Sequence, residues 1–69
     1  IHVAAWYSLA HAVYVYPTYG VYNRYYTLRP GDRLYIVSRS ADGHWCQVRT
    51  ADGRTGWVRY DHLSGHVRQ

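Results

Sequence analysis

The chain lacks covalent cross-links and membrane segments. It has one cysteine, Cys46, so no intramolecular disulfide can form. No run of 18 apolar residues occurs, so no membrane span is predicted, and no secretory signal peptide is visible. No stretch repeats apolar residues with a 3.6-residue period for three turns, which disfavours a helical fold. At 69 residues, the chain is one small domain that must be stabilised by packing.

Arrangements typical of enzymes and metal sites are also missing. Only four acidic residues are present, and none forms the paired carboxylates of acid–base catalysis. No Ser-His-Asp or Cys-His arrangement has a credible third partner. His44 and Cys46 alternate along the chain and His62 and His66 follow, but this spacing fits no standard zinc pattern. We therefore predict no catalytic residue, no metal and no cofactor, with solvated surface histidines and a half-buried Cys46 thiol.

Positive charge is present but dispersed. The eight basic residues are all arginines spread along the chain, and the net charge is +4. Such a charge weakly favours anionic surfaces. Arginines interleaved with tyrosines resemble single-strand nucleic-acid binders in composition. Without a basic cluster, a solvated arginine face with paired aspartates is the preferred interpretation, and nucleic acid is not a favoured partner.

Turn signals divide the second half of the chain into short strands. The chain is rich in Tyr (nine) and Trp (three), whose rings can lie half-buried on a small sheet. The tripeptide Ala-Asp-Gly occurs at 41–43 and again at 51–53, and Asp-Gly is a strong hairpin signal. The turns predict strands at 33–38, 44–49 and 54–59. The repeated tripeptide therefore marks two turns and not a duplicated domain, and the three strands form an all-β meander.

The first half of the chain and its end are less regular. A strand beginning at His11 is interrupted by Pro17, and residues 17–26 form a tyrosine-rich irregular hairpin or loop. After this segment, we expect Leu28 to be buried in the core. Residues 60–62 fit a single helical turn, after which Leu63 closes the core. We expect residues 65–69 to be a loose tail.

This order of elements resembles an SH3-like small barrel. The segment "DGHWCQVRTADGRTGWV" (42–58) is similar to the W-x-x-V…G-x-x-GWV pattern of bacterial SH3 domains, and "YDHL" (60–63) fits the short turn that follows it. The resemblance implies an all-β barrel of about five strands over residues 12–64, with an extension at 1–11 and a tail at 65–69. The implied core residues are Val13, Leu28, Leu34, Ile36, Val48, Val58 and Leu63.

The sequence departs from SH3 families at two places. "VYVYPTYG" (13–20) replaces the "LNVRSGPS"-like stretch of bacterial members and looks more like the tyrosine-rich entry of eukaryotic SH3 domains. Arg59 and His62 stand where eukaryotic domains carry a Pro and a Tyr. The platform for proline-rich peptides is therefore incomplete.

The resemblance implies a non-catalytic binding module of a secreted or envelope-associated bacterial protein. Such modules attach proteins to cell-wall peptidoglycan or to peptides. Flat aromatic rings suit these ligands, so we expect an aromatic groove in which Arg59 meets an anionic group. The stacking residues would be Tyr14, Tyr16, Tyr19, Trp45 and Tyr60. The alternative is that several of these rings simply cover a small core.

The N-terminal residues are too apolar for a linker that makes no contacts. Val3, Trp6, Tyr7 and Leu9 must pack on this barrel, on a preceding domain or on a neighbouring molecule. Docking on a neighbour would add a strand to an exposed sheet edge and produce a homo-oligomer or an open filament. The alternative function is therefore a self-assembling extracellular structural subunit.

Overall fold

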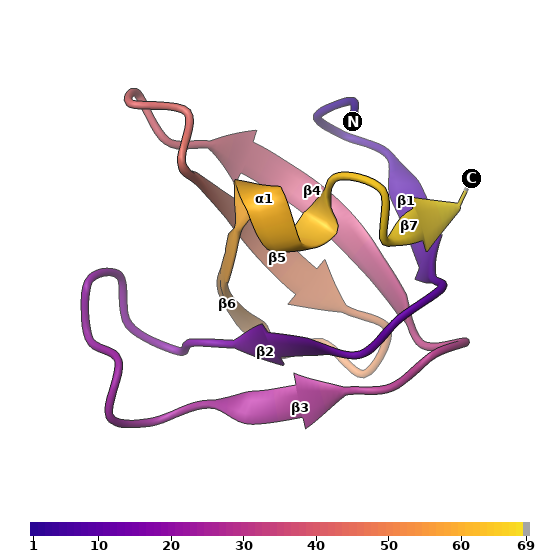
Figure 1. Ribbon diagram of the computed structural model, residues 1–69, viewed down its shortest axis with the longest axis horizontal. Coiled ribbons are helices and arrows are strands. Elements are labelled where there is room, and N and C mark those ends of the chain that lie inside the picture. Colours follow the sequence, from indigo (N-terminus) through magenta and orange to yellow (C-terminus); the bar gives the residue numbers. More distant parts are fainter. Residues whose placement is uncertain (69) are drawn as a thin grey trace.

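The computed structural model describes residues 1–68, and the chain is almost entirely β-structure (Figure 1). In chain order the elements are β1 (Trp6–Leu9), β2 (Val13–Val15), β3 (Tyr26–Leu28), β4 (Arg33–Arg39), β5 (Trp45–Thr50), β6 (Thr55–Arg59), α1 (Tyr60–Leu63) and β7 (Val67–Arg68). The predicted all-β class, the meander and the single helical turn are confirmed. Within residues 1–68 there are seven strands, two more than the approximate count expected.

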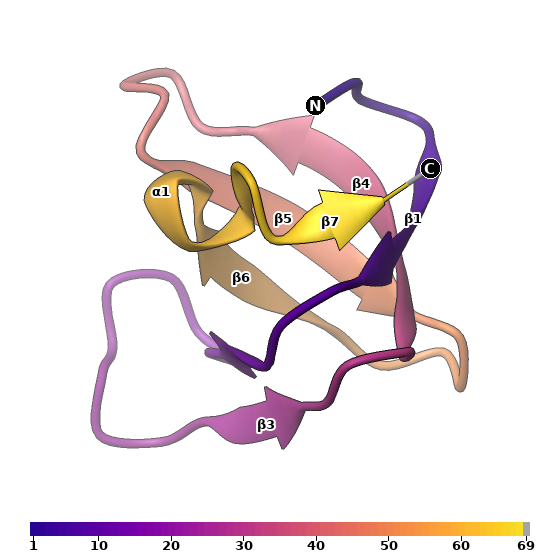
Figure 2. The ribbon, with the colours of Figure 1, turned by 45° about the vertical axis from the view of Figure 1, so that its right-hand side comes forward.

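Two antiparallel sheets form the barrel. The larger sheet has the order β6-β5-β4-β1-β7, and the smaller one pairs β2 with β3. The two sheets join where Tyr16 and Trp57 exchange both backbone hydrogen bonds, of 2.8 and 2.7 Å. The helical turn α1 and the β2–β3 pair lie on the side of the barrel that the larger sheet leaves open (Figures 1 and 2).

The repeated Asp-Gly turns have matching chemistry. Gly43 and Gly53 adopt φ values of +78° and +92°, which a side chain would disfavour. In the first turn Asp42 Oδ1 accepts hydrogen bonds from the Ser40 hydroxyl (2.5 Å) and the His44 N–H (3.0 Å). These bonds hold the pKa of the Asp42 carboxyl below its ordinary value.

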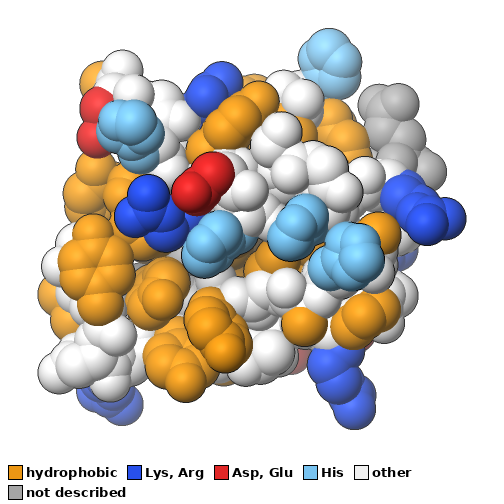
Figure 3. All heavy atoms as spheres, viewed as in Figure 1, with side chains coloured by type: hydrophobic (Ala, Val, Ile, Leu, Met, Phe, Trp, Pro, Cys, Tyr) orange, Lys and Arg blue, Asp and Glu red, His pale blue; other side chains and the backbone are white. Residues whose placement is uncertain are grey.

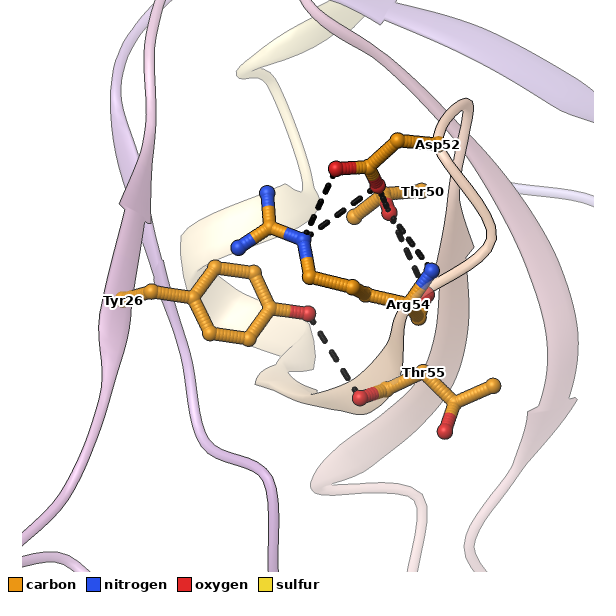
Figure 4. A network of polar contacts seen from close by, with 5 residues as sticks. All are labelled: Tyr26, Thr50, Asp52, Arg54 and Thr55. Carbon is orange, nitrogen blue, oxygen red and sulfur yellow. Dashed lines mark hydrogen bonds and ion pairs between the residues drawn. The ribbon is translucent and has the colours of Figure 1, made fainter.

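The second turn is also tied to β3. The Arg54 guanidinium carbon lies 4.1 Å from the Tyr26 ring centroid, and Arg54 Nε lies 3.0 Å from Asp52 Oδ2. The Tyr26 hydroxyl donates to the Thr55 carbonyl at 3.5 Å (Figure 4). Burial raises the pKa of Tyr26, although Arg54 opposes this shift. The network therefore holds the two-stranded sheet against the β5–β6 hairpin.

The core lies between the two sheets and beneath α1. All seven core residues implied by the resemblance are buried. Four further residues complete the buried cluster: Tyr7, Leu9, Val15 and Cys46. Cys46 is fully buried, which corrects the expectation of a half-buried thiol.

Both ends of the chain belong to the larger sheet. In β1, Trp6 pairs with Tyr35 and Ser8 with Arg33, so the N-terminal segment packs on its own barrel. The expectation of a loose C-terminal tail is wrong for residues 67–68, which form β7 and pair with Ser8 and Leu9. The reason is that β1 pairs with the edge of β4 that faces away from β5, and β7 in turn pairs with the outer edge of β1. Gln69 lies outside the described residues.

Candidate aromatic binding surface

The structure brings three of the predicted stacking residues together. Tyr16 directly follows β2, Tyr19 lies in the loop before β3, and Trp45 begins β5. The Trp45 ring centroid is 5.8 Å from that of Tyr16 and 5.9 Å from that of Tyr19. The tyrosine-rich loop therefore folds back over the start of β5.

Further rings extend this contact in both directions. Tyr25 lies 4.5 Å from Tyr14 and 5.9 Å from Tyr16, measured between ring centroids. Tyr22 lies 5.6 Å from Trp45, and Trp57 lies 4.8 Å from Tyr19. We call the connected set of rings the aromatic arc: Tyr14, Tyr16, Tyr19, Tyr22, Tyr25, Trp45 and Trp57.

Three members of the arc were missed by the sequence interpretation. Tyr22 and Tyr25 belong to the tyrosine-rich stretch already recognised, but an irregular loop has no periodicity that shows which rings meet. Trp57 could have been found, because it alternates with the buried residues Gly56 and Val58 and so must point away from the core.

Trp45 is the base of the arc and not its outer surface. It lies on the outward face of β5, since its neighbour Cys46 points into the core, yet only 5% of its surface is exposed. The loop tyrosines cover it. The rings that a ligand can reach are exposed by 46% (Tyr14), 45% (Tyr19), 55% (Tyr22) and 53% (Tyr25). In the space-filling view, hydrophobic side chains gather at the lower left, where Figure 1 shows the β2–β3 loop (Figure 3).

The remaining predicted ligand residues occupy different positions. The Arg59 guanidinium lies 5.6 Å from the Trp45 ring centroid, at the rim of the arc. Its Nε also pairs with Asp61 Oδ1 at 3.1 Å, and this contact keeps the pKa of Asp61 low. Tyr60 packs against the core, with the Arg39 guanidinium 3.5 Å from its ring centroid. The structure therefore places Arg59, but not Tyr60, beside the arc.

The predicted assembly residues are divided between core and surface. Tyr7 and Leu9 are buried in their own barrel, and the Tyr7 hydroxyl accepts a hydrogen bond of 2.7 Å from the His2 N–H. Val3 and Trp6 remain 53% and 40% exposed. Only these last two are free to contact another molecule.

Histidines gather on the side of the barrel that carries α1. The His11 and His66 ring centroids are 5.0 Å apart, and His62 and His66 line a hollow of about 310 Å³ that also includes Tyr14 (Figure 3). Within residues 1–68, no group of three or more His, Cys, Asp or Glu side chains could hold a metal ion.

Burial raises the pKa of the Cys46 thiol, although Arg39 opposes this shift.

The fold and the site together define a small β-barrel binding domain. The family model for the bacterial SH3 domain matches residues 12–64. The chain therefore belongs to the bacterial SH3 domain family, and the SH3-like fold predicted from the sequence is confirmed. This is a family of binding domains that are generally non-catalytic.

No curated protein and no solved structure is similar enough to this chain to count as a match. Among the helices of residues 1–68, none is long and apolar enough to cross a membrane.

Proposed function

We propose that this domain is a non-catalytic binding module of a secreted or envelope-associated bacterial protein. Its ligand is cell-wall peptidoglycan or a peptide, held on the aromatic arc. The observation that carries the proposal is the continuous contact of seven rings, four of which are about half exposed. An exposed cluster of this kind is unusual on a small domain unless it binds something.

The arrangement of the arc suits an extended ligand with both apolar and polar groups. The buried Trp45 ring supports Tyr19 and Tyr22 from below, so these rings are partly ordered before a ligand arrives. A ligand that stacks on preordered rings loses less conformational entropy in the complex. At the rim, Arg59 retains free N–H donors beside its pair with Asp61, and these can meet a carboxylate of a stem peptide.

The experiment is co-sedimentation of the chain with purified peptidoglycan sacculi, with titration against soluble stem peptides in parallel. We expect Tyr19→Ala and Tyr25→Ala each to weaken binding by roughly tenfold or more, since truncating an aromatic hot-spot residue costs about 2 kcal/mol or more. Val21→Ala is the matched control, because Val21 is an exposed apolar residue of the same loop outside the arc.

This experiment distinguishes the two classes of ligand, glycan and peptide. Binding to sacculi and to free stem peptides places recognition on the peptide, whereas binding to sacculi alone requires the glycan. Near-ultraviolet circular dichroism must show that each variant remains folded. Tyrosine variants that bind as well as the parent chain would exclude the arc, and failure to bind either ligand would refute the proposal.

Self-assembly is the second candidate function, and one feature favours it. Within residues 1–68, β7 pairs only with Ser8 and Leu9, so the outer edge of β1 at Trp6 has no strand partner there. A second copy could add a strand at this edge. Light scattering over a concentration series, with negative-stain images, tests this. Assemblies that disappear in Trp6→Lys, which places a charge at this edge, would support it, and a monomer at every concentration would exclude it.

A further inference from the structure

A second group of aromatic and arginine side chains lies on the outward face of the larger sheet. Trp6 of β1, Tyr35 of β4 and Arg49 of β5 lie opposite one another in adjacent strands. Arg33 lies two residues before Tyr35 on the same face of β4. We call these four residues the arginine–aromatic row. None of the ring contacts of the aromatic arc includes Trp6 or Tyr35.

Each ring in the row contacts one guanidinium group. The Trp6 and Tyr35 ring centroids are 5.4 Å apart, with the ring planes inclined at 57°. The Arg33 guanidinium carbon lies 5.5 Å from the Trp6 centroid, and that of Arg49 lies 5.1 Å from the Tyr35 centroid. Contact with a ring restricts the guanidinium while its edge N–H groups can still donate to an anion.

Within residues 1–68, neither Arg33 nor Arg49 has an ion-pair partner. The two ion pairs found among residues 1–68 use Asp52 and Asp61, with Arg54 and Arg59. Asp32 is next to Arg33 in sequence, but its carboxylate accepts a hydrogen bond of 2.8 Å from the Arg29 N–H. Asp32 and Asp52 line a hollow together with Arg33, but neither forms an ion pair with it, so the guanidinium groups of Arg33 and Arg49 keep N–H donors for an anionic ligand.

The position of the row in the sheet restricts how a ligand can bind. Both edges of β4 are already paired, with β1 on one side and β5 on the other. A peptide cannot add to β4 as a new strand, so a ligand that lies over Tyr35 and Arg33 is recognised through the side chains of the row. The ligand must supply a flat apolar surface for the Trp6 ring, which is 40% exposed, and an anion close to that surface.

We propose that the arginine–aromatic row binds an acidic polysaccharide whose carboxylates are carried on the sugar rings. In such a polymer the carboxylate is attached to the same ring that stacks, and Arg33 lies directly beside Trp6. In single-stranded nucleic acid the phosphate is separated from the stacking base by the ribose.

The test is calorimetric titration of the full chain with an oligogalacturonate of eight residues, and with its fully methyl-esterified form as a neutral control. We expect binding to the acid that weakens with added salt, and no binding to the ester. Arg33→Gln and Arg49→Gln should each lower the affinity by about tenfold, the lower range for hydrogen bonds to a charged group. Arg24→Gln removes the same charge from the exposed loop and should leave the affinity unchanged.

Each other outcome contradicts the proposal. If the ester bound as tightly as the acid, the carboxylates would not contribute to recognition. If Arg24→Gln lowered the affinity as much as Arg33→Gln does, the attraction would depend on net charge and not on the row. A single-stranded oligothymidylate that binds at least as tightly at the same salt concentration would make the row a nucleic-acid surface. Tyr19→Ala, which alters the aromatic arc, should leave oligogalacturonate binding intact, so failure here is distinguishable from failure of the proposed function.

Discussion

Gly56 of β6 lies directly against Val15 at the end of β2. A Cβ atom on Gly56 would overlap the Val15 Cγ1 methyl group and come within 3.1 Å of the Tyr16 carbonyl oxygen. At this point the smaller sheet joins the larger one through the hydrogen bonds between Tyr16 and Trp57. The closure of the barrel therefore depends on the absence of a side chain at position 56.

Gly56→Ala should consequently destabilise the domain. The added methyl group has to displace Val15 or the β2 backbone, and overpacking of this kind typically costs about 1–3 kcal/mol. Urea denaturation followed by tryptophan fluorescence measures the change. In a Val15→Ala background the clash is relieved, so the second substitution should cost less than it does alone. Additive effects of the two changes would contradict this account of the contact.

The N-terminal strand should be required for folding. Leu9 is 3% exposed within the core, and Leu9→Ala should lower the free energy of unfolding by about 2–5 kcal/mol. Val3 is 53% exposed, and Val3→Ala should change it by less than about 0.5 kcal/mol. Denaturant titration of both variants checks this. A chain lacking residues 1–9 that still folds would show that β1 is dispensable.

The sequence was most informative where structure is determined locally. The β4–β5–β6 meander could be predicted because each Asp-Gly turn acts within a few residues of the strands it connects. The pairings of β1 with β4 and with β7 could not be predicted, because the paired strands are distant in sequence and the matched family pattern begins at residue 12. Val67 and Arg68 also form too short a strand to give a recognisable pattern.

The candidate site was predictable in composition but not in arrangement. Clustered tyrosines indicated an aromatic surface, and Tyr16, Tyr19 and Trp45 do meet there. The burial of Trp45 depends on how the loop folds over β5, which no local pattern specifies. Tyr60, at the start of α1, packs against the core. The direction of its side chain also depends on tertiary packing, which no local pattern specifies.

The Cys46 thiol should be protected in the folded domain. It is fully buried, and burial raises its pKa, so little reactive thiolate is present near neutral pH. Ellman's reagent should label the native chain at least about a thousandfold more slowly than the urea-unfolded chain, since labelling requires opening. An Ala41→Cys variant in a Cys46→Ala background exposes a thiol in the first Asp-Gly turn and should react at once. Rapid labelling of native Cys46 would show that β5 opens readily.

Acid should weaken the domain through its turn aspartates. In the second turn the Asp52 carboxylate accepts hydrogen bonds from the Thr50 hydroxyl and from Arg54, and these contacts hold its pKa below its ordinary value. A carboxyl whose pKa is lowered by folding contributes stability above its unfolded pKa, and that stability is lost as the pH falls through the folded pKa. Asp42 and Asp61 are shifted in the same direction.

The urea midpoint should therefore be steady near neutral pH and fall as the pH drops below about 4. Asp52→Asn removes one titrating group together with its ion pair to Arg54, so this variant should be less stable at pH 7 and lose less stability on acidification. Because Asp52 is exposed, salt should screen part of the effect. An unchanged pH dependence in Asp52→Asn would mean that the second turn does not contribute to acid sensitivity, and that the Asp42 and Asp61 contacts carry it instead.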